Sequence, residues 1–191
     1  KTRFDGFVLP IISILTEDTE LIEDMFSRLN EAVPLNAAEK RNALGGPVPP
    51  KIRDITKHKY FTEKLPFNNK RYRHFDVATK FLYIAQRGHL ADTKKVHLDD
   101  FVKAHRDNKT ADAVADLAME TSRSLDDMAA VFVDGDALLR SVGTTVLYYF
   151  LFLDARKNGW TESLSRADFE AFDDVRIKNR TAAEEDGSNA N

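Results

Sequence analysis

Four side chains near residues 28–42 are suited to binding phosphate. They are two guanidinium groups and two carboxamides, Arg28, Asn30, Arg41 and Asn42. An Arg fork matches phosphate oxygens bidentately, and free N–H groups at the start of a helix favour anions. The ammonium group of Lys40 is a weaker candidate. These residue types would suit a bound phosphate at a corner between two helices.

The same corner also has the features of a turn that needs no ligand. Asn36 and Glu39 have the spacing of a capping box, with Asn in place of Ser or Thr. Pro34 restricts the chain before the helix, and Gly45-Gly46 offers a left-handed residue after it. A well-capped helical turn is therefore the alternative interpretation.

A second candidate surface is the basic stretch of residues 51–75. It holds eight basic residues against two acidic ones, a local charge of +6, with five aromatic residues interleaved. Basic and aromatic side chains together suit a nucleic-acid backbone and its bases. The predicted nucleic-acid contacts are Lys64, Lys70, Arg71 and Arg73. In the alternative interpretation the aromatics belong to the core and the charges form a solvated face.

The distribution of charge along the chain indicates which half could meet a polyanion. Residues 111–191 carry sixteen acidic and eight basic residues, a local charge of −8, although the whole chain is only at −3. A phosphate backbone is repelled by such a region. We therefore expect any polyanion to meet the first half of the chain.

Several other kinds of chemistry have no support in the sequence. The chain lacks cysteine, which excludes disulfides and thiolate metal sites and fits a reducing cytoplasm. Its five histidines lack ligand spacing, so we predict no metal site. The longest apolar run, residues 146–153, falls far short of the roughly 20 residues that span a bilayer. We expect a cytoplasmic protein with no membrane partner.

The elements that position these residues follow from hydrophobic periodicity. Residues 7–15 form a continuous aliphatic run that predicts a buried strand, and apolar residues at helical spacing predict a helix ending near Leu29. Further helices are predicted at 71–86, 97–105, from 110 to about 134, at 141–157 and from 165. The segment 141–157 is apolar nearly all round, so we expect it at the centre of the helical part.

Three segments resemble the closing motif of a bacterial family. They are Phe26-Ser-Arg-Leu-Asn30, Pro34-Leu-Asn36 and Glu39-Lys-Arg-Asn-Ala43. The family includes the N-terminal half of GmrSD-type modification-dependent restriction enzymes, and its fold is related to ParB and sulfiredoxin. Comparable residues follow in His58-Lys-Tyr-Phe61, in Phe67-Asn-Asn-Lys-Arg71 and in the helix with Ala78, Phe81 and Leu82.

The resemblance implies binding and hydrolysis of a nucleoside triphosphate, with Mg²⁺ in the full-length protein, and a role in defence against phage or modified DNA. It makes Arg28, Asn30, Arg41 and Asn42 the predicted nucleotide-binding residues. Phe26 and Asn30 match the family's Phe-x-x-x-Asn motif. The upstream Asp-Gly-Gln-Gln-Arg motif occurs nowhere in these 191 residues. We therefore expect this chain to be inactive alone, and to depend on a missing N-terminal part of the domain or on a partner chain.

The sequence predicts a mainly α chain with an α+β remnant: one strand and helix of a ParB/sulfiredoxin-like α/β unit, then a helical bundle. Residues 1–46 are expected to close a ParB-like nucleotide-binding domain, 47–180 to form a helical domain, and 181–191 to be a disordered tail or linker. The start at Lys1 and the polar end suggest a piece of a longer protein. The alternative function is a DNA-binding or subunit-docking helical module without catalysis of its own.

Overall fold

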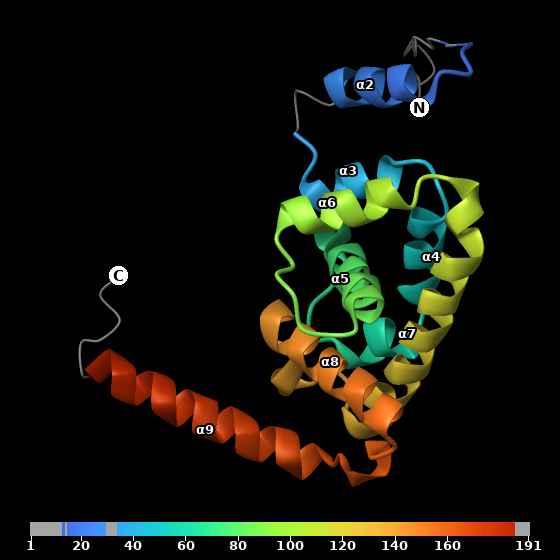
Figure 1. The fold of residues 1–191 in the computed structure, drawn as a ribbon. Coiled ribbons are helices and arrows are strands. Elements are labelled where there is room, and N and C mark those ends of the chain that lie inside the picture. The colour runs from blue at the N-terminus through green and yellow to red at the C-terminus, as the bar shows by residue number, and fades with distance from the viewer. Residues whose placement is uncertain (1–12, 14, 30–33, 186–191) are drawn as a thin grey trace, which may run out of the picture. The chain divides into compact units, whose positions relative to one another are not determined.

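The computed structural model describes residues 13, 15–29 and 34–185 (Figure 1). Regular structure in these ranges is helical, with no strand, and amounts to 75% helix. The predicted helical bundle is confirmed. The predicted strand at 7–15 lies outside the described residues, except for Ser13 and Leu15, which belong to no regular element.

The chain divides into two units, residues 1–35 and residues 36–191. The first unit contains α2 (Thr19–Leu29). The Asp18 carboxylate accepts hydrogen bonds from the backbone N–H groups of Glu20 and Leu21, at 2.9 and 3.2 Å. Asp18 therefore caps this helix, as its position before an amphipathic run predicts.

The second unit opens with α3 (Ala37–Ala43) and α4 (Val48–Ile55). Its remaining elements, in chain order, are η1 (Tyr60–Lys64), η2 (Lys70–Tyr72), α5 (Arg73–Arg87), α6 (Lys95–Ala104), η3 (Asn108–Thr110), α7 (Ala111–Val131), η4 (Ala137–Leu139), α8 (Val142–Asn158), η5 (Thr161–Ser163) and α9 (Arg166–Glu185). The long helices agree with the predicted segments to within a few residues.

The capping box before α3 is confirmed in both directions. The Glu39 backbone N–H donates to Asn36 Oδ1 at 2.9 Å, and the Asn36 backbone N–H donates to Glu39 Oε2 at 2.7 Å. Gly46 then turns the chain with φ +100°, a conformation that side chains disfavour. Its Cα faces the backbone of His105 and Arg106 so closely that a Cβ would lie 2.8 Å from the Arg106 Cα.

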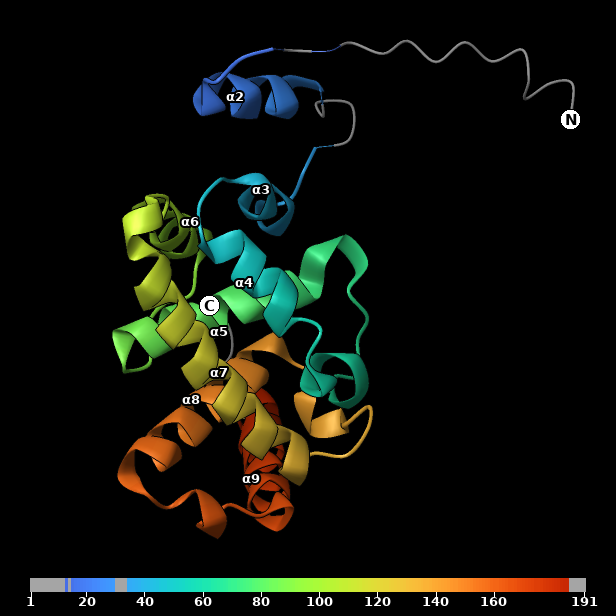
Figure 2. The same cartoon turned by 90° about the vertical axis from the view of Figure 1, so that its right-hand side faces the viewer.

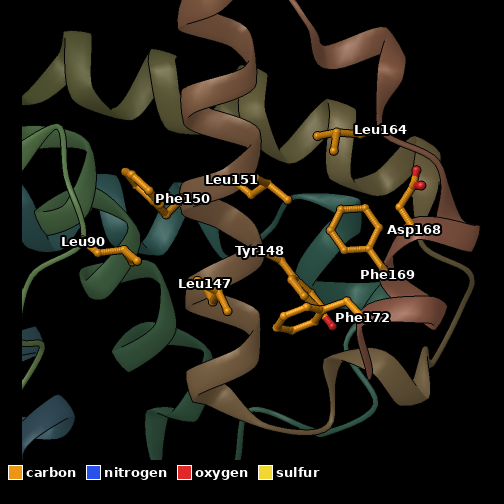
Figure 3. A pocket seen from close by; sticks show the side chains of 9 residues that line it. All are labelled: Leu90, Leu147, Tyr148, Phe150, Leu151, Leu164, Asp168, Phe169 and Phe172. Carbon is orange, nitrogen blue, oxygen red and sulfur yellow. The ribbon is translucent and has the colours of Figure 1, made fainter. Parts of the chain in front are cut away.

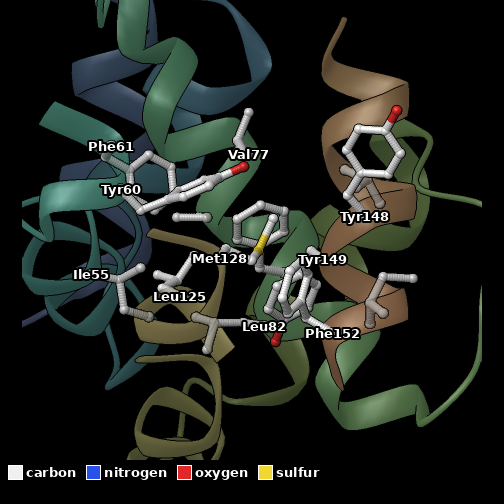
Figure 4. Close-up of a cluster of buried hydrophobic side chains, with 14 of the residues drawn as sticks. Ile55, Tyr60, Phe61, Val77, Leu82, Leu125, Met128, Tyr148, Tyr149 and Phe152 are labelled. Atoms are coloured by element: carbon white, nitrogen blue, oxygen red, sulfur yellow. The ribbon is translucent and has the colours of Figure 1, made fainter. Parts of the chain in front are cut away.

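The core lies where α5, α7 and α8 pack against one another (Figures 1 and 2). Phe81 of α5 stacks on Tyr149 of α8 with ring centroids 4.1 Å apart. Leu125 and Met128 of α7 are fully buried beside Tyr149 (Figure 4). The prediction that α8 is the most central helix is thus supported by burial. Leu147, 36% exposed, marks the side of α8 that the core leaves uncovered.

The last helix is held to this core at its N-terminal end. Phe169 is buried against Phe152 and Tyr148, and Arg166 pairs with Asp136. Arg140 reaches Asp173 at 3.2 Å. None of the helices in the described part of the chain has the length and apolar character needed to cross a membrane.

Candidate nucleic-acid interface

Six consecutive residues, 68–73, are exposed; they include η2 and the first residue of α5. We refer to this segment, Asn-Asn-Lys-Arg-Tyr-Arg, as the basic loop. It contains Lys70, Arg71 and Arg73 and no acidic residue. The structure therefore brings three of the four predicted nucleic-acid contacts into one short exposed segment.

Hydrogen bonds within the segment fix the shape of the basic loop. Asn69 Oδ1 accepts from the His74 backbone N–H at 2.9 Å, and the Asn69 carbonyl accepts from Tyr72 N–H at 3.1 Å. Asn68 Oδ1 accepts from Lys70 N–H at 3.1 Å. Below the loop, His74 Nε2 lies 2.7 Å from the Phe67 carbonyl oxygen, to which it donates. The loop is thus ordered before any ligand binds.

Two residues of the basic loop have left-handed backbone conformations. Arg71 has φ 52° and Tyr72 has φ 61°, and among the described residues these are the non-glycine positions with positive φ. Such a conformation costs roughly 1–2 kcal/mol for an L-residue. Asn36 contributes to holding it, because its Nδ2 donates to the Arg71 carbonyl oxygen at 2.8 Å. No glycine or asparagine stands at either position, so sequence reasoning did not predict this feature.

The three cations of the basic loop have different partners. Arg71 Nε and Nη2 donate to the two carboxylate oxygens of Glu39 at 3.1 and 2.8 Å, and these bonds are the main cause of the lowered pKa of Glu39. The Arg73 guanidinium carbon lies 3.8 Å from the centre of the Phe67 ring, an arrangement that leaves its charge intact. Lys70 is exposed and has no carboxylate partner in the described part of the chain.

The structure separates Lys64 from this group. Lys64 lies on η1, its side chain is 15% exposed, and its Nζ pairs with Asp134 at 2.5 Å. The backbone of Lys64 is also bound to the segment that contains Asp134, because the Asp136 N–H donates to the Lys64 carbonyl oxygen at 2.9 Å. Lys64 therefore attaches η1 to the segment before η4 and is not presented with the basic loop.

Some aromatic residues of the stretch 51–75 belong to the core, and others lie at the surface beside the cations. Tyr60 and Phe61 are buried in the core beside Phe81, as the structural alternative predicted. Phe67 is half-buried and Tyr72 is 38% exposed. Only the part of the stretch around the basic loop presents an aromatic ring together with cations.

The predicted nucleotide-binding residues are not seen as one cluster. Arg41 is 2% exposed, with Nη1 2.9 Å from Asp99 and Nη2 2.5 Å from Asp76. Its charge is compensated by these carboxylates, so it positions α3 against α5 and α6 and does not face solvent as a phosphate ligand. Asn42 accepts from Arg53 Nη1 at 2.9 Å.

The other two predicted ligands cannot be placed beside them. The side chain of Arg28 and the whole of Asn30 lie outside the described residues, and both belong to the first unit. The nucleotide-binding corner therefore stays a prediction for Arg28, Asn30 and Asn42. For Arg41 the structure shows a structural role instead.

Hollows on the surface of the helical unit are further candidates for a site. The hollow between α8 and α9, about 330 Å³, is lined by Leu147, Leu151, Phe172 and other apolar side chains, with the carboxylate of Asp168 at its edge (Figure 3). An open groove between α4 and α7, about 530 Å³, has Lys51 and His58 on its walls. The groove is also lined by Asp54 and Ser122, but its carboxylate, imidazole and hydroxyl groups bond other residues. Asp54 pairs with Lys57, His58 Nε2 lies 3.2 Å from Asp126, and Ser122 donates to the Ala118 carbonyl oxygen. The apolar hollow has a carboxylate, Asp168, but no basic side chain. The described residues contain no group of three or more potential metal ligands.

No protein-family model, curated protein or solved structure matches this chain.

Proposed function

We propose that the helical unit is a nucleic-acid-binding module and that the basic loop contacts the phosphate backbone. The observation that carries this proposal is the exposure of Lys70 and Arg73 in one internally hydrogen-bonded segment, where neither cation has a carboxylate partner among the described residues. Arg71 lies between them and is paired with Glu39. A preordered loop binds with a smaller entropic cost than a loop that must fold onto its ligand. The acidic second half of the chain would direct a polyanion to this face.

Phosphate contacts of this kind have a measurable signature. Each phosphate neutralised on duplex DNA releases counterions and contributes about −0.9 to the slope of log K against log salt. Because Glu39 compensates Arg71, the expected contacts are those of Lys70 and Arg73. Two contacts would give a slope near −1.8, so that affinity falls roughly twelve-fold between 50 and 200 mM salt. Sequence preference should be weak, because phosphates carry no base information.

The test measures binding of a labelled duplex by fluorescence anisotropy across a salt series. We expect Lys70→Ala/Arg73→Ala to lower affinity for unrelated sequences alike and to reduce the salt slope by about two. This variant leaves the Arg71–Glu39 pair in place. The control, Lys103→Ala/Lys109→Ala, removes the same charge from exposed residues of α6 and η3. A flat salt response in the wild type, or an equal loss in the control, would refute the proposal.

We further propose that this module belongs to a bacterial defence protein of GmrSD type, whose full-length form binds a nucleoside triphosphate with Mg²⁺ and controls restriction of foreign or modified DNA. The support is the motif from Phe26 to Ala43 together with the confirmed helix–cap–helix order around Asn36. In the full-length protein, Asn30→Ala should abolish triphosphate hydrolysis, whereas Asn179→Ala on exposed α9 should not. Unchanged turnover in Asn30→Ala would remove Asn30 from the site.

A further inference from the structure

Two aromatic side chains of the described residues are exposed by more than a third, and their surroundings have opposite charge. Phe172 is 44% exposed on α9 and is followed by Asp173 and Asp174. Tyr72 is 38% exposed and lies between Arg71 and Arg73 in the basic loop. Arg71 is paired with Glu39, but Lys70 and Arg73 have no carboxylate partner among the described residues. An exposed ring between two such cations suits an anionic ligand that also has a flat apolar face.

The Tyr72 ring is held in a defined orientation. It meets the Phe75 ring edge to face, with centroids 4.7 Å apart and planes at 82°. This geometry is a favourable one for an aromatic pair and restrains the exposed ring. The backbone of Tyr72 is also fixed, because its N–H donates to the Asn69 carbonyl at 3.1 Å.

The backbone conformation adds a second reason to attribute a role to this ring. Tyr72 has φ 61°, which asparagine or glycine would adopt at lower cost. The residue nevertheless stays 38% exposed. Strained conformations in exposed, well-held loops are frequently associated with ligand binding.

We propose that Tyr72 is a stacking platform for an unpaired base, and that the module therefore binds single-stranded nucleic acid in preference to duplex. This inference rests on the proposed function, since Lys70 and Arg73 would hold the phosphates on either side. Bases in a duplex are stacked on one another and do not present a free face, whereas a single strand can place a base on the tyrosine ring. Stacking on an aromatic side chain tolerates any base, so the preference concerns strandedness and not sequence.

The test uses a short oligothymidylate with one fluorescent adenine analogue, single-stranded or annealed to its complement. We expect the wild type to bind the single strand more tightly and to quench the analogue, as stacking does. Tyr72→Phe should keep both properties, because the ring is retained. Tyr72→Asn should weaken single-strand binding by roughly five- to one-hundred-fold and abolish quenching, with little effect on duplex binding.

Two features of the design separate stacking from a structural effect. Asparagine tolerates the left-handed backbone, so Tyr72→Asn should fold, which thermal unfolding by circular dichroism checks. Phe172→Asn removes the other exposed ring and should change neither affinity nor quenching. An equal loss of single-strand and duplex binding in Tyr72→Asn would overturn the stacking role.

The outcomes also distinguish this inference from the proposed function. If the wild type binds duplex and single strand equally, with steep salt dependence and no quenching, the phosphate-binding function stands and the stacking platform is refuted. If the wild type binds neither form, both proposals fail.

Discussion

Asn36 joins the capped corner to the basic loop. Its Oδ1 accepts the Glu39 backbone N–H at 2.9 Å, while its Nδ2 donates to the Arg71 carbonyl oxygen at 2.8 Å. Glu39, the other half of the capping box, also binds the Arg71 guanidinium. The residues that end the turn before α3 therefore also hold the left-handed segment of the loop, and the corner and the loop form one structural unit.

The two functions of Asn36 can be separated by substitution. Asn36→Ser keeps a short cap acceptor but does not reach Arg71, whereas Asn36→Ala loses both bonds. We expect Asn36→Ala to lower the free energy of unfolding by about 1–2 kcal/mol, and Asn36→Ser by less. Both variants should accelerate amide hydrogen exchange at Tyr72 and weaken nucleic-acid binding. Protection at Tyr72 equal to that of the wild type in both would show that Asn36 does not hold the loop.

We expect the ion pairs of buried Arg41 to contribute to the free energy of unfolding. Arg41→Met would leave Asp76 and Asp99 without their shared partner, although Lys80 and Lys95 still contact them at 2.9 and 3.0 Å. Since both carboxylates are partly exposed, we expect a loss of about 2–3 kcal/mol, below the range for fully buried pairs. Urea unfolding of the wild type and of Arg41→Met would measure this loss in the free energy of unfolding.

A compensating variant tests the cause of that loss. Arg41→Met combined with Asp76→Asn and Asp99→Asn should recover part of the stability, because the unpaired charges are removed. Full stability in the single variant Arg41→Met would show that the guanidinium is not structurally required. It would also reopen the possibility that Arg41 serves a ligand.

His74 makes stability depend on pH. Burial lowers the pKa of His74 from its usual 6.5, the hydrogen bond to the Phe67 carbonyl opposes this, and Arg73 lowers it further. The unfolded chain therefore binds more protons than the folded one as the pH falls below 6.5. Above the pKa that His74 has in the unfolded chain, the neutral imidazole makes its full contribution to the free energy of unfolding. This contribution is lost as the pH falls through the pKa of His74 in the folded protein.

We expect the free energy of unfolding to decrease on going from about pH 7.5 to about pH 5, and the decrease to be smaller in His74→Gln. The variant can still donate a hydrogen bond but cannot titrate. Denaturant unfolding at each pH measures the difference. His97→Gln, which alters a partly exposed histidine on α6, serves as the control. The same pH dependence in His74→Gln as in the wild type would contradict the assignment.

Gly46 and Gly88 form a matched pair for testing the turn after α3. Both have positive φ, +100° and +66°, but only Gly46 has backbone atoms against it, whereas a Cβ at Gly88 would meet nothing within 4 Å. We expect Gly46→Ala to cost about 2–3 kcal/mol and Gly88→Ala about 1 kcal/mol. Thermal unfolding compares the two. Equal costs would indicate that the backbone of Arg106 shifts to make room.

Local features of this protein were predictable because short-range interactions specify them. The Asn36–Glu39 capping box depends on residues three apart, and α8 follows from a run of apolar residues in sequence. The basic character of the segment around Lys70 is likewise a property of composition. Each of these can be recognised without knowing what the segment packs against.

The partners of the charged side chains depend on contacts between distant parts of the chain. Arg41 finds Asp76 and Asp99 at separations of 35 and 58 residues, and Lys64 finds Asp134 at 70. Sequence reasoning had no means of assigning these pairs, so it treated both cations as available for phosphate. Packing of α3 against α5 and α6 places the Arg41 guanidinium between these two carboxylates.

The sequence by itself determined a chain of capped, amphipathic helices with a basic first half and an acidic second half, because periodicity and charge are read residue by residue. Only the tertiary structure decided that Arg41 is buried between carboxylates while Lys70, Tyr72 and Arg73 are presented together. The physical reason is that both arrangements depend on contacts between residues at least 35 positions apart. Arg41 pairs with Asp76 and Asp99, and Asn36 donates to the carbonyl of Arg71, whose left-handed backbone an arginine disfavours.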